Sequence, residues 1–179
     1  YAFQEMAEKA KKDIEQEFHP YIFDGVSGSI EEAVIRRLEE QDLTISCAES
    51  CTAGALSARL GSVGGASTVY FGSIVSYSNR AKEKMLDVEF GEYGAVSEEI
   101  TLQMAKGAQK KFETDVAISV SGILGPTGGS KEKPVGTICY TILKGNEEET
   151  GTTHFTGDRL TIREKVVQFL LIKTWKMLS

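Results

Sequence analysis

Two side chains that can act as nucleophiles stand next to each other in AESCTAG, residues 48–54. They are Ser50 and Cys51, and the carboxylate Glu49 precedes them. An apolar run comes before this stretch and a helix-like segment follows it, so we expect a strand-to-helix corner. The first N–H groups of a helix are unpaired, and over Ser50 they would stabilise an oxyanion. Spacing alone favours a simpler interpretation, in which Ser50 or Thr52 is a helix N-cap.

A nucleophile of this kind needs a base, and the sequence offers few. The chain has only two histidines, His19 near the N-terminus and His154 in an expected edge strand, so a Ser–His–Asp triad is not expected. A lysine must be neutral to act as a base, and burial lowers its pKa by several units. YSNRAKEKML places Lys82 and Lys84 on a short helix that Asn79 is expected to cap. Lys82 precedes two apolar residues by three and four positions and can lean inward, although a solvated lysine is the usual case.

Two further loops carry residue types that bind anions. GILGPTGGS, residues 122–130, crowds four glycines and a proline into nine residues, which suits either an anion-binding backbone nest or a plain wide turn. It matches neither a Walker A loop nor a dinucleotide loop. Arg159 stands at the first turn of the last helix, where it can bind a phosphate or pair with Asp158 or Glu164. The run KEKP, residues 131–134, is expected to be solvated.

Strands and helices alternate along the chain, which predicts a sheet covered by helices on both faces, mixed where a hairpin joins it. Ligands then gather at the carboxyl ends of the strands. The strands are expected at 19–25, 43–48, 71–78, 115–122 and 135–143, with a turn at 146–150 before a hairpin partner at 151–157. The helices are expected at 3–17, 29–41, 52–60, 79–86, 97–112 and 159–178, the last with Leu160, Val166, Val167, Leu170, Leu171, Trp175 and Leu178 along its apolar side.

The composition limits the function classes. The 179 residues are 41% apolar and 26% charged, which fits one ordinary globular domain with a short appendage. A net charge of −6 argues against non-specific nucleic-acid binding. No apolar run approaches the length of a membrane span, and the start is no signal peptide. Because the chain lacks an initiator Met, we expect a fragment of a longer protein. Three cysteines without a CxxC pair predict neither disulfides nor a zinc site.

Five blocks occur in the order and spacing of a known family: AESCTAG, VSYSNRAK, YGAVSEE, SVSGILGPTGGSKEKPVGT and TGDR. In these the chain resembles the CinA C-terminal domain family, which includes stand-alone nicotinamide mononucleotide deamidases. The resemblance implies an α/β protein, a three-layer α/β/α sandwich with a mixed, mostly parallel sheet, at residues 28–179. Residues 1–27, a helix and a short strand, resemble the end of the linker region that precedes this domain in full-length CinA proteins.

The resemblance also implies a reaction, the hydrolysis of nicotinamide mononucleotide to nicotinate mononucleotide and ammonia. Ser50 would be the nucleophile and Lys82 the base, with Tyr77 beside them as a third catalytic residue, through which the lysine can pass a proton to the departing ammonia. Ala53 replaces a glycine that is usual in the family, which would crowd the pocket slightly. The residues expected to bind substrate are Cys51, Thr52, Gly54, Ser121, Gly122, Gly125, Gly128 and Arg159, the last through the phosphate.

Neither a metal nor a cofactor is expected, and the protein would be cytoplasmic. The expected partner is a pyridine mononucleotide, with no nucleic acid or membrane, in a homo-oligomer for which a dimer is favoured. An interaction or DNA-associated protein is disfavoured by the acidic balance and the absence of a basic stripe, and two alternatives stay open. One is a non-catalytic nucleotide-binding regulatory domain, and the other is an amidase whose nucleophile is Cys51.

Overall fold

A five-stranded sheet forms the centre of the protein, in a computed structural model that describes residues 2–18 and 28–179. Its strands lie in the order β2-β1-β3-β4-β5. β1 is parallel to β2 and β3, whereas β4 is antiparallel to β3 and β5. Four strands therefore run in one direction and β4 alone is reversed, which confirms the mixed, mostly parallel sheet. The strands are β1 Ile45–Glu49, β2 Tyr70–Val75, β3 Val116–Gly122, β4 Thr137–Lys144 and β5 Glu147–His154.

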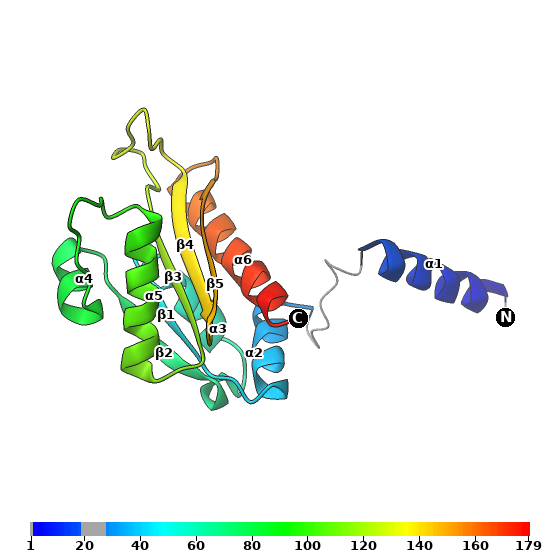
Figure 1. Cartoon of the computed structure of the whole chain (residues 1–179). Coiled ribbons are helices and arrows are strands. Elements are labelled where there is room, and N and C mark those ends of the chain that lie inside the picture. The colour runs from blue at the N-terminus through cyan, green and yellow to red at the C-terminus, as the bar shows by residue number, and fades with distance from the viewer. Residues whose placement is uncertain (1, 19–27) are drawn as a thin grey trace.

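Helices cover both faces of this sheet, so the predicted three-layer α/β/α arrangement is confirmed (Figure 1). α2, α3 and α6 pack against one another on one face. α5 lies across the other face, with α4 beside it. The helices are α2 Ile30–Glu40, α3 Ala55–Gly61, α4 Asn79–Leu86, α5 Glu98–Phe112 and α6 Arg159–Met177, and a short 3-10 turn, η2, spans Ala66–Thr68.

Each face of the sheet has its own apolar core. The larger core lies under α2, α3 and α6, where Leu38, Ile118 and Leu170 are fully buried. On the other face Ala48 of β1 packs with Ile100 and the rest of a smaller cluster between α4 and α5. Every residue of β1 is buried, as expected for a strand paired on both sides in a sheet covered on both faces. β1, which leads into the turn after it, is thus covered from above and below.

Serine and aspartate side chains begin the long helices. Ser29 accepts a hydrogen bond from the N–H of Glu32, as the sequence predicts for α2, and Ser97 begins α5 in the same way. At α4 the cap is Ser78, one residue before the predicted Asn79. Asp158 caps α6 through the N–H of the third residue after it. Three of the helices that surround the site therefore begin at defined residues.

Two sequence predictions about the C-terminal part are wrong in detail. The segment predicted as a turn, residues 146–150, is mostly strand, because a two-residue turn at Gly145 and Asn146 leads directly into β5. β5 is an edge strand, and Glu147 and Glu148, two of the charged residues that made it look like a turn, are exposed to solvent. Leu160 is 61% exposed, and Ile162 is the buried residue of the first turn of α6.

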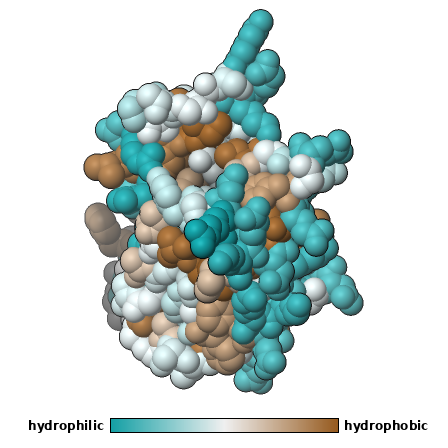
Figure 2. All heavy atoms as spheres, turned by 90° about the vertical axis from the view of Figure 1, so that its left-hand side faces the viewer, coloured by the Kyte–Doolittle hydropathy of each residue, from teal (hydrophilic) through white to brown (hydrophobic). Residues whose placement is uncertain are grey.

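The N-terminal helix α1, Ala2–Phe18, matches the predicted helix at 3–17. The short strand predicted at 19–25 lies outside the described residues. Over residues 2–18 and 28–179, no helix has both the length and the apolar character that crossing a membrane requires. Figure 2 views the molecule from the side of α4, and apolar and hydrophilic side chains alternate over much of that face.

Candidate active site

The turn that carries Ser50 follows β1 directly and precedes α3. Ser50 is 8% exposed, and its own N–H donates to the carbonyl of Val120 on the neighbouring β3. α3 begins later than predicted, at Ala55, because residues 51–54 form turns. The N-cap position is occupied by Gly54, which has a positive φ of 93° and no side chain to cap with. Neither Ser50 nor Thr52 is the N-cap, so the simpler interpretation of this stretch is wrong.

The N–H groups at the start of α3 are already bonded, to the carboxylate of Glu49. The N–H groups of Gly54 and Leu56 donate to Glu49 Oε2 at 2.9 and 3.2 Å, and the N–H of Ser57 donates to Oε1 at 2.8 Å. The expectation that the helix terminus itself receives an oxyanion at Ser50 is therefore wrong. Within the described part of the chain, no backbone carbonyl accepts from the N–H groups of Cys51 and Thr52, and the Cys51 N–H lies against the thiol of its own residue.

Lys82 reaches Ser50 from the first turn of α4. Its Nζ donates to Ser50 Oγ at 2.8 Å and to the carbonyl oxygen of Ser76 at 2.8 Å. The side chain is 2% exposed, so the inward orientation expected for Lys82 is confirmed. Lys84, two residues later, is exposed, so the two lysines of this helix differ in environment.

Burial lowers the pKa of Lys82 below its ordinary value of 10.5, because a buried ammonium loses its hydration. Among the described residues, no carboxylate forms an ion pair with Lys82 that would restore the charged form. In the neutral amine the contact with Ser50 runs in the opposite direction, and the serine O–H donates to Nζ. The geometry thus suits removal of the serine proton by the amine.

Burial favours the neutral form of Cys51 as well, but for a cysteine the neutral form is the unreactive one. Cys51 is 5% exposed, and burial raises the pKa of its thiol to about 12. A thiolate is the reactive form of cysteine, and very little of it exists near neutral pH at that pKa. Cys51 therefore lacks the environment of a cysteine nucleophile.

Tyr77 and Arg159 meet at the mouth of the site. One terminal nitrogen of Arg159 donates to Tyr77 Oη at 2.6 Å, and the other donates to the carbonyl of Gly125 at 2.9 Å. Asp158 bonds instead to the start of α6, and Glu164 pairs with Arg163. The ion pairs proposed as alternatives for Arg159 are absent from the described residues. The guanidinium is exposed to solvent and turned toward the pocket.

A pocket of about 220 Å³ joins these groups at the carboxyl ends of β1, β2 and β3. Lys82 and Arg159 supply two basic side chains, and none of the described residues lining the pocket is acidic. An anionic or electron-rich ligand suits such a surface. The lining residues are Ser50, Cys51, Tyr77, Asn79, Lys82, Ala95, Val96, Ser121, Gly122, Leu124 and Arg159.

Several predicted substrate-binding residues lie outside this lining. Thr52 is fully buried, and Gly54 is the N-cap residue of α3, where its N–H donates to Glu49. Gly125 takes part only through its carbonyl, which orients Arg159. Gly128 lies on the exposed part of the glycine-rich loop, outside the pocket lining, and its role in substrate binding stays a prediction.

The sequence interpretation missed the pocket wall at Ala95 and Val96. Ser121 Oγ donates to the carbonyl of Ala95 at 2.6 Å, and Lys133 Nζ donates to the carbonyl of Val96 at 2.5 Å. Ser121 thus holds the wall rather than presenting a free hydroxyl. Ala95 and Val96 carry no chemistry of their own, but both lie in the block YGAVSEE, which was the available signal.

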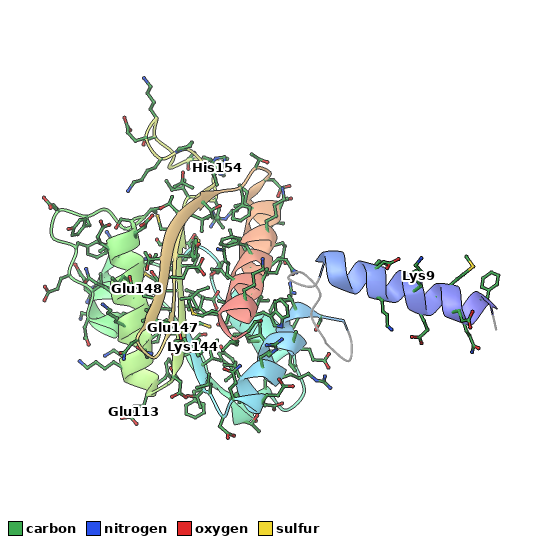
Figure 3. The ribbon with its side chains drawn as sticks, turned by 45° about the vertical axis from the view of Figure 1, so that its right-hand side comes forward. Lys9, Glu113, Lys144, Glu147, Glu148 and His154 are labelled. Atoms are coloured by element: carbon green, nitrogen blue, oxygen red, sulfur yellow. The ribbon has the colours of Figure 1, made fainter. Side chains whose placement is uncertain are left out.

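Neither a histidine nor a metal cluster contributes to the site among the described residues. Figure 3 shows His154 at one end of β5, with Glu147, Glu148 and Lys144 at the other end. His154 Nε2 contacts the carbonyl of Val135 at 2.9 Å, and the residue lies on the predicted edge strand. Within residues 2–18 and 28–179, no three His, Cys, Asp or Glu side chains gather in a way that would hold a metal.

Comparison with known proteins gives a consistent result. Residues 27–178 match the family described as CinA C-terminal domain. A CinA-like protein of Dictyoglomus turgidum is 44% identical over 163 residues, which are 89% of this chain and 40% of that protein. The chain thus spans less than half of this relative, and the predicted division at residues 1–27 and 28–179 stays a prediction.

Similar solved structures come from the same family. The competence damage-inducible protein A of Klebsiella pneumoniae is 32% identical with a TM-score of 0.81, covering 83% of this chain and 94% of that one. A CinA superfamily protein of Escherichia coli is 31% identical with a TM-score of 0.80, covering 87% and 94%. The chain belongs to the CinA C-terminal domain family.

Proposed function

We propose that this protein hydrolyses the carboxamide of nicotinamide mononucleotide, giving nicotinate mononucleotide and ammonia by a serine–lysine mechanism. The observation that carries the proposal is the 2.8 Å contact between Lys82 Nζ and Ser50 Oγ, made by a lysine that is 2% exposed. A serine beside a desolvated lysine is the arrangement that activates a hydroxyl without histidine. The resemblance of the motifs to nicotinamide mononucleotide deamidases supplies the substrate.

In the first half of the reaction, Ser50 Oγ attacks the carboxamide carbon and its proton passes to Lys82. The N–H groups of Cys51 and Thr52, to which no backbone carbonyl is bonded among the described residues, are the donors proposed for the oxyanion. The tetrahedral intermediate collapses when its C–N bond breaks. The departing amide nitrogen takes the proton from Lys82 and leaves as ammonia. Water then attacks the acyl-serine, with Lys82 again removing and returning a proton. No net charge or electron is gained by the protein.

The pocket supports an anionic mononucleotide as substrate. Its volume is small for a ligand of this size, which suits enclosure of the pyridine ring with the phosphate near the mouth. Arg159 lies at that mouth, exposed and held by Tyr77 and Gly125, where its guanidinium can bind the phosphate in a bidentate manner. A nucleoside lacking the phosphate would lose this contact alone.

The first experiment measures ammonia release from nicotinamide mononucleotide without added metal. Ser50→Ala and Lys82→Ala are expected to abolish turnover, because one removes the nucleophile and the other the base. Cys51→Ala is expected to keep it, since the thiol has a raised pKa. Lys84→Ala is the matched control, because this lysine lies on the same helix and is exposed.

Two results would contradict the proposal. Turnover that survives in Ser50→Ala and disappears in Cys51→Ala would assign the reaction to cysteine. Binding of the mononucleotide by calorimetry with no turnover in the parent protein would favour the non-catalytic nucleotide-binding domain.

A further inference from the structure

We propose that Glu49 is a positioning residue, which fixes the turn carrying Ser50 and so aims the serine at its base. The inference rests on the proposed function, because it gives Ser50 the role of nucleophile. Glu49 is fully buried at the end of β1, yet it neither lines the pocket nor contacts Lys82. The reaction above gives it no chemical step. A buried carboxylate needs such an explanation, since burial of this group is costly unless it is hydrogen-bonded.

The contacts of Glu49 close a ring around the nucleophile. Four donors meet its two carboxylate oxygens: the N–H groups of Gly54, Leu56 and Ser57, and the hydroxyl of Ser57. All of them lie after Ser50 in the chain, whereas Glu49 lies immediately before it. The side chain therefore ties both ends of the turn together, with Ser50 as the first residue inside the ring.

The turn inside this ring has an unusual backbone. Ala53 has a φ of 53° and Gly54 a φ of 93°, both in the left-handed region. A residue with a Cβ is rare there, and such a conformation persists when its surroundings determine it. One of the hydrogen bonds to Glu49 comes from Gly54, directly after Ala53. The carboxylate thus holds the residue directly after the strained Ala53, inside the same turn as Ser50.

Glu49 also connects the nucleophile to the base through its backbone. Its carbonyl accepts a hydrogen bond from the N–H of Ser76 at 2.8 Å, and the carbonyl of Ser76 accepts from Lys82 Nζ. The same residue therefore fixes the turn of Ser50 by its side chain and the anchor of Lys82 by its main chain. A small rotation at Glu49 would change the contact between Ser50 and Lys82 from both sides.

A carboxylate is required here rather than an amide. The N–H groups of Leu56 and Gly54 meet one oxygen, and both donors of Ser57 meet the other, so both atoms must accept. Glutamine keeps the shape but replaces one acceptor by an NH₂ group, which is a donor. In Glu49→Gln the NH₂ group would face backbone N–H donors on one side of the ring, and the turn would loosen. Ser50 and Lys82 would both still be present.

The test measures the reactivity of Ser50 directly, as well as turnover. An alkyl fluorophosphonate reports the nucleophile without the natural substrate: the serine oxygen bonds to phosphorus, fluoride leaves, and the proton goes to the base. We would compare the wild-type protein with Glu49→Gln and with Ser57→Ala, which removes one of the four donors. Ser62→Ala is the matched control, because its hydroxyl bonds to Arg59 at the opposite end of α3. Mass spectrometry locates the adduct, and near-UV circular dichroism verifies folding.

In folded Glu49→Gln we expect the labelling rate of Ser50 and kcat to fall about 100-fold, the size of effect that a misplacement of about 1 Å produces. KM should change little, because Glu49 does not line the pocket. Ser57→Ala should move both rates in the same direction by less. Ser62→Ala should leave them unchanged.

The outcomes separate this inference from the proposed function. Labelling of Ser50 in folded Glu49→Gln at the rate of Ser62→Ala would overturn the positioning role. If Glu49→Gln does not fold, Ser57→Ala decides, and an unchanged labelling rate there overturns it too. Wild-type protein that labels at Ser50 but releases no ammonia would remove the proposed substrate and leave the positioning role standing. No labelling of wild-type Ser50 would remove both.

Discussion

The pH dependence of turnover should follow the deprotonation of Lys82. A lysine at its ordinary pKa of 10.5 is neutral in only about 0.03% of molecules at pH 7, and lowering the pKa by one unit raises that fraction about tenfold. Because the base must be neutral, kcat/KM is expected to rise with pH at about tenfold per pH unit. The rise should level off at the folded-state pKa, which lies below 10.5.

Ammonia release measured between about pH 6 and pH 10 gives this profile, since lysine pKa values fall into that range when the side chain is buried. Lys82→Arg keeps a cation in place but cannot give up its proton, so it is expected to lose activity at every pH. Lys84→Arg is the control on the exposed face of the same helix. An activity that is independent of pH below the plateau, or one that survives in Lys82→Arg, would refute the assignment of the base.

The same burial makes a prediction about folding, with a definite sign. The pKa of Lys82 is lower in the folded than in the unfolded protein, so the unfolded chain binds more protons between those two values. The contribution of Lys82 to the free energy of unfolding is therefore fully present above the unfolded pKa and is lost as the pH falls through the folded one. A difference of one pH unit between the two pKa values corresponds to about 1.4 kcal/mol. Urea denaturation across this window should show a rise in stability with pH that Lys82→Met lacks.

Three further predictions concern the pocket and the packing around it. Arg159→Ala should raise KM for the mononucleotide about 10- to 100-fold, the range of a charge-assisted hydrogen bond, and leave KM for the nucleoside unchanged; equal effects on both would contradict phosphate binding. Ser121→Ala should raise KM a few-fold, because the pocket wall that it holds by one neutral hydrogen bond loosens, and steady-state kinetics would detect this. Gly107→Ala should lower the free energy of unfolding by about 1–3 kcal/mol, because its Cβ would lie 2.3 Å from the carbonyl oxygen of Leu86. Gly61→Ala, where nothing lies within 4 Å, is the control in thermal or urea denaturation.

Much of this fold follows from local sequence signals. Alternating strands and helices predicted the layered sheet, and serine caps predicted where α2 and α5 begin. The apolar residues that follow Lys82 at helical spacing allowed it to turn inward, and the resemblance of YSNRAK to the family motif selected it as the base. These signals succeed because each depends on residues within one or two helical turns of one another.

The rest depended on contacts between distant segments. The pocket wall at Ala95 is held by Ser121, 26 residues away. Neither an alanine nor a serine predicts from its type that this contact forms. β5 was misjudged because an edge strand tolerates charges such as Glu147 that a buried strand does not. The start of α3 was placed too early because its cap comes from Glu49, outside the helix and on the preceding strand. No pattern of N-cap residues predicts a carboxylate that reaches back from a strand.

That carboxylate also explains how a lysine can serve as a base so close to an acidic residue. A free carboxylate next to Ser50 would attract the ammonium form of Lys82 and hold its pKa up. Here the carboxylate of Glu49 is bonded to the N–H groups at the start of α3, whose partial positive charge compensates it. The carboxylate does not ion-pair with Lys82, which remains buried against the hydroxyl of Ser50 and a neutral carbonyl. The helix terminus, which the sequence suggested as the oxyanion site, instead binds the carboxylate of Glu49 and so keeps a negative charge from pairing with the proposed base.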